Sequence, residues 1–231
     1  MIGGVDLQFV TIVTYGRTGS TALQAALNSL PGVVVRGENY NAVRGLHEYM
    51  QSISEAADRH HSGKPAHPWF GTARLVPLEV LDDLRRHVVE FVLRPRAGTS
   101  WTGFKEVRYE PGHFEDPDAL LDYLLFLDKL LPGMRYLVNV RAAEDAARSG
   151  WWPENPEAVA VLERTRASLA WATAELQRML GGDRAVLIDH AHWTQDPQVV
   201  IDACARLGLP RDDDAMRAAL GHRLDHGPHA S

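Results

Sequence analysis

The chain has 231 residues, of which 45% are hydrophobic and 23% are charged, and its net charge is −6. This length and composition predict a soluble globular protein with a single α/β-sized domain over residues 1–231. The negative charge argues against a general nucleic-acid-binding protein, so any anionic ligand must be held by local arginines and backbone N–H groups.

Three features predict a cytoplasmic protein without a membrane span. Cys204 is the single cysteine, so no intrachain disulfide can form, as expected in a reducing compartment. Residues 1–8 lack the basic and apolar regions of a signal peptide. No apolar run approaches the roughly 20 residues that a membrane span needs.

Apolar runs and amphipathic stretches alternate along the chain. They predict strands at 9–14, 33–35, within 101–109, at 134–140 and at 185–189, and helices at 21–30, 41–60, 77–92, 117–131, 142–149, 155–180, 199–209 and 211–220. This alternation predicts an α/β fold with a mostly parallel central sheet flanked by helices. Residues 221–231 are expected to form a flexible tail.

The connection between the first strand and the first helix reads Tyr-Gly-Arg-Thr-Gly-Ser-Thr over residues 15–21. Its glycines let the backbone turn sharply and bring N–H groups close to an oxyanion. The helix N-terminus adds free N–H donors, the hydroxyls add more, and Arg17 is a permanent cation. The pattern indicates an anion-binding loop formed by Gly16, Arg17, Thr18, Gly19, Ser20 and Thr21. The alternative is an ordinary loop before a capped helix.

This loop differs from the Walker loop that binds ATP. The pattern G-x-x-x-x-G-K-[ST], laid over residues 14–21, puts its first glycine at Thr14 and its lysine at Ser20. Without that lysine, the loop suits a phosphate group better than a triphosphate.

Charged residues follow three other predicted strands. Glu38 follows the second strand and Gly37, at the strand end that faces the ligand in α/β sheets, where it could accept a proton or simply be solvated. Lys105, one of three lysines, lies within a predicted strand. Arg141 ends the strand at 134–140, and Ser149 follows eight residues later, about two helical turns.

The loop at 15–21 resembles the 5′-phosphosulfate loop of sulfotransferases that use 3′-phosphoadenosine 5′-phosphosulfate (PAPS). Arg17 is similar to the residue found in bacterial carbohydrate and small-molecule members, where many other members have Lys. Pro31, Glu38, the Gly-Phe-Lys core that ends at Lys105, and the spacing from Arg141 to Ser149 are also similar to family features. The resemblance implies a P-loop-like nucleotide-binding fold in which residues 16–21 hold the 5′-phosphate and Arg141 and Ser149 hold the 3′-phosphate.

The resemblance further implies a transferase that moves the sulfuryl group of PAPS to a hydroxyl or amine of a small-molecule or carbohydrate acceptor, releasing PAP. In that scheme Glu38 is the base, Arg17 and Lys105 neutralise charge on the bridging oxygen, and no metal is required. Two alternatives remain: a P-loop kinase that uses ATP, and a nucleotide-binding module without catalysis. The sequence does not identify the acceptor or the oligomeric state.

Three more segments carry expectations about the acceptor side. Residues 60–71, which contain Trp69 and Phe70, are expected to form a mobile loop over the acceptor site. Trp151 and Trp152 are expected either to offer aromatic faces to the ligand or to form a hydrophobic lid. The histidines at 190 and 192 are expected either to contact the site or to lie at the surface.

Overall fold

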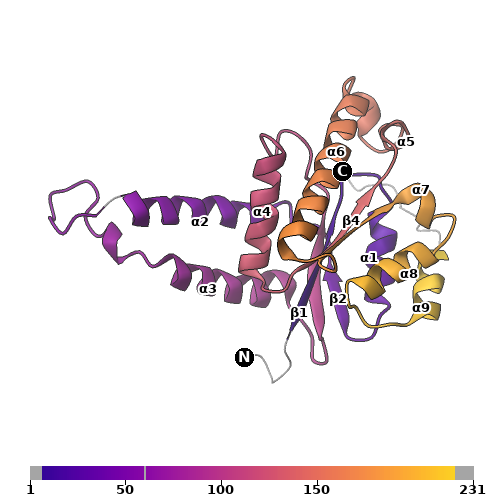
Figure 1. Ribbon diagram of the computed structural model, residues 1–231, viewed down its shortest axis with the longest axis horizontal. Helices are drawn as coiled ribbons and strands as arrows, with labels where there is room; N and C mark the ends of the chain where they lie inside the picture. Colours follow the sequence, from indigo (N-terminus) through magenta and orange to yellow (C-terminus); the bar gives the residue numbers. More distant parts are fainter. Residues whose placement is uncertain (1–6, 60, 222–231) are drawn as a thin grey trace.

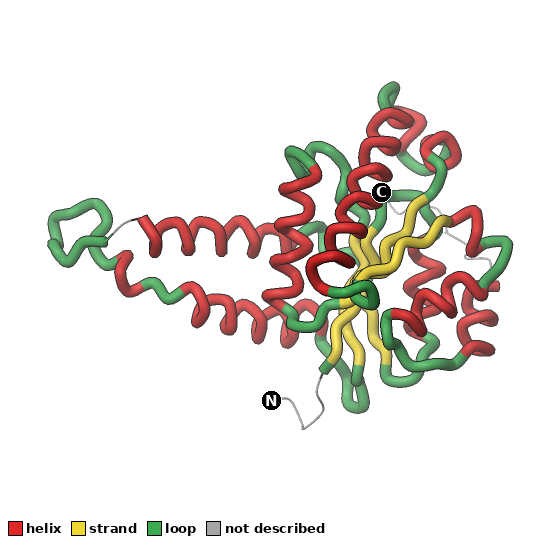
Figure 2. The backbone as a smooth tube through the Cα atoms, in the orientation of Figure 1, coloured by secondary structure: helices red, strands yellow, loops and turns green. Residues whose placement is uncertain are grey.

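The computed structural model describes residues 7–59 and 61–221, and a five-stranded parallel sheet lies at its centre (Figures 1 and 2). The strands are β1 (Gln8–Val13), β2 (Val33–Arg36), β3 (Trp101–Glu106), β4 (Arg135–Val140) and β5 (Ala185–Asp189). Their order across the sheet is β2-β3-β1-β4-β5. The predicted α/β class with a parallel sheet is therefore confirmed. Of the tail expected at 221–231, Gly221 is the last residue of a helix, and residues 222–231 lie outside the described residues.

Helices cover both faces of the sheet. They are α1 (Ser20–Asn28), α2 (Ala42–Arg59), the 3₁₀ turn η1 (Thr72–Arg74), α3 (Pro77–His87), the π-helix η2 (Val88–Leu93), α4 (Pro117–Leu130), α5 (Ala143–Ala147), the 3₁₀ turn η3 (Trp152–Glu154), α6 (Ala158–Leu180), α7 (His190–Trp193), α8 (Gln198–Arg206) and α9 (Asp213–Gly221). Helices α1, α8 and α9 lie on one face, and α4 and α6 lie on the other (Figure 1). No described helix has the length and apolar character needed to cross a bilayer.

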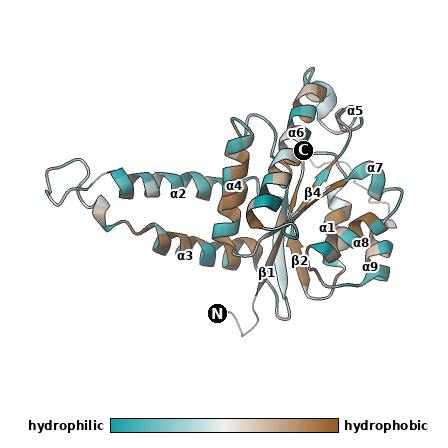
Figure 3. Cartoon of the chain, viewed as in Figure 1, coloured by the Kyte–Doolittle hydropathy of each residue, from teal (hydrophilic) through white to brown (hydrophobic). Residues whose placement is uncertain are grey.

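Strand β1 shows why the chain builds two cores. Successive side chains of a strand point to opposite faces of the sheet. Val10 and Ile12 accordingly join the apolar cluster under α1, and Phe9 and Val13 join the cluster under α4 and α6. Hydrophobic residues gather on the strands and on α4, and hydrophilic residues gather on the outer helices (Figure 3). Each fully buried large apolar side chain contributes about 1.5–3 kcal/mol to this arrangement.

Helices α2 and α3 form a projecting arm, which we define as residues 42–87 (Figure 1). Helix α2 has 18 residues and is therefore about 27 Å long. It runs away from the sheet, and α3 returns alongside it, with only the base of the arm packed on α4. The connection between them therefore lies at the far end of the arm. Residues 61–71, which were expected to lie over the acceptor site, therefore lie away from the carboxyl ends of the strands (Figure 1).

Candidate functional site

Strand register brings the predicted site residues to one edge of the sheet. Val13 at the end of β1 lies opposite Glu106 at the end of β3, and it lies opposite Val138 of β4. The loop after β1, Lys105 near the end of β3, and Arg141 just after β4 are therefore level with one another. In α/β proteins this carboxyl edge is where ligands bind.

The loop between β1 and α1 has the backbone of an anion-binding turn. Arg17 and Gly19 both have left-handed backbones, with φ of 70° and 76°. Gly19 is the N-cap of α1 and has no side chain to occupy the free N–H groups of the first turn. A Cβ at Gly16 would lie 2.4 Å from a ring carbon of Trp151, so any larger residue there would displace the Trp151 ring. The first turn of α1 therefore offers N–H donors towards solvent.

Polar contacts with β4 fix this loop. The Asn139 side-chain amide donates to the Thr18 carbonyl at 2.9 Å and accepts from the Trp193 indole N–H at 2.9 Å. The Thr14 hydroxyl donates to the Asn139 carbonyl at 2.6 Å. The Thr18 hydroxyl is buried and is 2.7 Å from the Thr14 hydroxyl, so it shapes the loop from inside. Of the predicted ligand-binding hydroxyls, only those of Ser20 and Thr21 line the cavity described below.

The structure brings Arg141 and Ser149 into direct contact with the loop. Arg141 donates from Nη1 to the Arg17 carbonyl at 2.8 Å, and Arg17 donates from Nε to the Ser149 hydroxyl at 3.1 Å. The buried Arg141 Nε has no hydrogen-bond partner among the described residues. Gly150, with φ of 69°, leaves room for the Arg17 side chain, because a Cβ there would approach it to 2.7 Å. Two groups of anion-binding donors therefore adjoin each other.

Tyr15 connects the same two segments. Its hydroxyl accepts from the Arg141 N–H at 2.7 Å and donates to the Arg141 carbonyl. Burial raises the pKa of Tyr15, against the opposing effect of the Arg141 backbone hydrogen bond, so the phenol stays neutral and can make both contacts.

Glu38 and Lys105 form an ion pair beside the loop. Lys105 Nζ lies 2.8 Å from Glu38 Oε1, and Arg108 Nη1 lies 3.1 Å from Glu38 Oε2. The Lys105 side chain is only 7% exposed, whereas that of Glu38 is 36% exposed. Burial alone would raise the pKa of Glu38, but the hydrogen bonds and charges of Lys105 and Arg108 outweigh it and lower the pKa. Glu38 is therefore ionised.

Glu106 and Arg108, which the sequence analysis did not single out, hold the turn that carries Glu38. The fully buried Glu106 carboxylate accepts from the backbone N–H groups of Asn39 at 3.2 Å and Asn41 at 3.0 Å. It also accepts from Arg108 Nη1 at 2.8 Å. Tyr40 and Asn41 both have φ of 58°, a left-handed backbone that is costly for residues other than glycine. The Glu106 contacts stabilise this turn.

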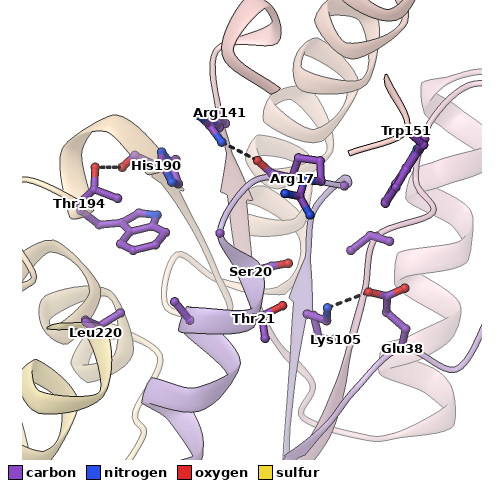
Figure 4. Close-up of a pocket in the computed structure, with 15 residues that line it drawn as sticks. Arg17, Ser20, Thr21, Glu38, Lys105, Arg141, Trp151, His190, Thr194 and Leu220 are labelled. Carbon is purple, nitrogen blue, oxygen red and sulfur yellow. Dashed lines mark hydrogen bonds and ion pairs between the residues drawn. The ribbon is translucent and has the colours of Figure 1, made fainter. Parts of the chain in front are cut away.

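These groups surround one cavity of about 440 Å³ (Figure 4). Its lining residues are Gly16, Arg17, Gly19, Ser20, Thr21, Ala22, Glu38, Lys105, Val107, Arg141, Trp151, His190, Trp193, Thr194 and Leu220. Trp151 thus faces the cavity, whereas Trp152 is buried. His190 also faces the cavity, one of the two positions expected for it, because the short helix α7 follows β5 directly. Burial and the nearby Arg141 lower the pKa of His190.

No protein-family model and no curated protein sequence matches this chain. Several solved structures resemble this chain. The sulfotransferase domain of the olefin synthase from Synechococcus PCC 7002 is 17% identical, with a TM-score of 0.55 over 96% of this chain and 80% of that one. The sulfotransferase domain from the curacin biosynthetic pathway is 14% identical, with a TM-score of 0.55 over 95% and 80%. Mouse sulfotransferase SULT7A1, solved in complex with PAP, is 12% identical, with a TM-score of 0.47 over 92% and 63%.

The first two of these likenesses cover nearly the whole chain. Together with the parallel sheet order, they show that this chain has a sulfotransferase-type fold. At such low identity the likeness concerns the fold, so activity must be argued from the cavity itself.

Proposed function

We propose that this chain is a single-domain, cytoplasmic sulfotransferase that uses PAPS as donor and a hydroxyl or amine of a small molecule or carbohydrate as acceptor. One observation carries the proposal: Arg17 contacts both Arg141 and Ser149, which joins two anion-binding groups. PAPS carries phosphate groups at two positions of one adenosine, so a ligand of this kind needs two such groups close together. The sulfotransferase-type fold supports the same conclusion.

The cations around the cavity explain how an acidic chain binds an anionic donor. Residues 17–21 hold the 5′-phosphate through backbone N–H groups and the hydroxyls of Ser20 and Thr21. Arg141 and Ser149 hold the 3′-phosphate, with the Arg141 Nε as one available donor. In this structure Arg17 donates a hydrogen bond to Ser149. When PAPS binds, contacts with its phosphate oxygens replace that hydrogen bond.

In the transfer step an acceptor oxygen or nitrogen forms a bond to sulfur as the bond from sulfur to the 5′-phosphate oxygen breaks. Glu38, which is ionised, takes the acceptor proton. Arg17 and Lys105 stabilise the charge that develops on the leaving oxygen, so the scheme requires no metal ion. The 2.8 Å contact between Lys105 and Glu38 supports this placement, because it puts the base and the cation on the same side of the cavity.

The direct test combines binding with transfer. PAP at 100 times its dissociation constant should stabilise the chain by about 2.7 kcal/mol, seen as a higher melting temperature. Arg141→Ala should remove most of this effect. Arg148→Ala is the matched control, because Arg148 lies on the same segment but is 72% exposed and pairs with Asp145. Labelled sulfate from PAPS should then appear on an acceptor from a panel of sugars and phenols. Stabilisation by ATP with Mg²⁺ but not by PAP would contradict the proposal and favour a kinase.

A further inference from the structure

The far end of the arm, residues 61–78, carries an exposed apolar and basic surface, which we call the arm tip (Figure 2). Four of its large apolar side chains are well exposed: Trp69 at 42%, Phe70 at 53%, Val76 at 44% and Leu78 at 74%. The arm tip contains Lys64 and Arg74 but no Asp or Glu, in a chain with a net charge of −6. Several exposed large apolar side chains in one short basic segment favour an interaction surface.

The arm cannot cover this surface by itself. A hairpin of two helices offers each helix only one neighbour, and none of the described side chains of α3 is fully buried. The arm tip also points away from the sheet, and η1 within it makes its main contacts with α2 of the same arm.

A second cavity lies between α4 and α6, and its volume is about 600 Å³. Apolar side chains form most of its wall, including Phe114, Leu120, Ala167 and Trp171. We call it the α4–α6 cavity. Glu115 and Asp116 stand exposed at its edge, and Glu110 and Asp118 belong to the same short segment. Arg164 is the one cation among the described lining residues.

We propose that the arm tip of one copy of this chain docks into the α4–α6 cavity of a second copy. The apolar wall takes the exposed rings at 69 and 70, and the carboxylates at the rim face Lys64 and Arg74. Because each copy offers both an arm tip and a cavity, two identical contacts close a two-fold dimer. The docked arm also contacts the connection from β3 to α4, which carries Arg108. This contact does not depend on sulfuryl transfer.

A membrane surface is the alternative partner of the arm tip, because the arm tip is basic and contains aromatic residues. Two Lys or Arg side chains contribute only about 1 kcal/mol each at an anionic membrane, which gives weak attachment. The α4–α6 cavity, in contrast, matches the arm tip in both polarity and charge and has no other occupant among the described residues. A second copy is therefore the partner that the surface chemistry favours.

Light scattering on the full chain, after size-exclusion chromatography at about 50 μM, measures the association. We expect a mass twice the 25.6 kDa of the chain, falling towards 25.6 kDa as salt rises. The double variant Trp69→Ala/Phe70→Ala should weaken dimerisation at least about 30-fold. So should Ser168→Trp, which fills the cavity. Phe91→Ala is the control, because Phe91 is 64% exposed but lies in η2, outside the arm. Melting curves and PAP binding verify that each variant is folded.

Mixing the two variants gives the decisive result. The arm-tip variant keeps its cavity and the cavity variant keeps its arm tip, so the 1:1 mixture restores one of the two contacts, and a heterodimer should appear. A monomeric wild-type chain, a dimer that survives both variants, or a mixture that stays monomeric would each overturn the proposal. A monomeric wild-type chain that sediments with phosphatidylserine vesicles would also overturn it and assign the arm tip to a membrane surface.

Discussion

Replacing Arg108 with glutamine tests whether the ion pairs around Glu38 set the protonation of the base. Arg108 Nη1 lies 3.1 Å from Glu38, and an opposite charge at such a distance lowers a carboxyl pKa by roughly 1–3. Because 36% of the Glu38 side chain is exposed, water partly screens the pair. Loss of the guanidinium should therefore raise the pKa of Glu38, because one of the two cations that lower it is removed.

The direction of the change in activity follows from the protonation of Glu38. Only the ionised carboxylate accepts a proton, so a higher pKa reduces the active fraction at low pH and leaves it unchanged at high pH. The acidic limb of kcat/KM for sulfate transfer should move to higher pH, and the rate on that limb should fall, with no change on the alkaline side. The position of the limb does not depend on how much enzyme is folded, which matters because Arg108 also contacts the buried Glu106.

Arg86→Gln serves as the control, since Arg86 is 72% exposed and pairs with Asp83 on the arm. If the acidic limb of kcat/KM stays at the same pH in Arg108→Gln, or shifts equally in Arg86→Gln, the proposed effect of Arg108 on Glu38 is refuted. In that case Glu38 either is not the base or is insensitive to Arg108.

Three further substitutions test the site. Glu38→Gln should lower kcat by about 10²- to 10⁴-fold but keep the melting-temperature rise caused by PAP, and an unchanged rate would show that another group is the base. Gly19→Ala should lower the free energy of unfolding in urea by more than about 1 kcal/mol. The reason is that φ is 76° at this position and the new Cβ would lie 2.9 Å from the rings of His190 and Trp193. A variant as stable as the wild type would contradict this loop geometry. Asn139→Leu should cost about 2–4 kcal/mol in the same assay, because the Trp193 N–H loses its buried partner, and a loss near zero would count against the buried network.

The local pattern of the sequence was enough to predict the β1–loop–α1 unit. Strand, glycine turn and amphipathic helix are consecutive there, and each has its own short-range signal. Arg141 could also be predicted, because a residue that ends a parallel strand must lie at the carboxyl edge of the sheet. The hydrogen bonds that join Arg17 to Arg141 and Ser149 fit the predicted proximity of the two segments.

The remaining contacts depend on register and direction, which no short-range pattern encodes. Glu106 reaches the backbone of Asn39 and Asn41 only because β2 and β3 pair in one register. Asn139 was detectable as a polar residue in an apolar strand, but its partner Trp193 lies 54 positions away. The direction of the arm could not be predicted either, because the sequence of an amphipathic helix shows which face is apolar but not which element that face packs against.

The strand order β2-β3-β1-β4-β5 separates the two substrates of the proposed reaction in space. In the proposed reaction, the phosphate-binding residues follow β1 and β4, whereas the base follows β2 and its companion Lys105 lies next to the end of β3. The segment between β2 and β3, which includes the arm, is attached to the edge of the sheet that carries the proposed base. In the proposed reaction, changes in that insertion can therefore alter the acceptor, or the contact with the proposed second copy, and leave the proposed nucleotide-binding residues unchanged.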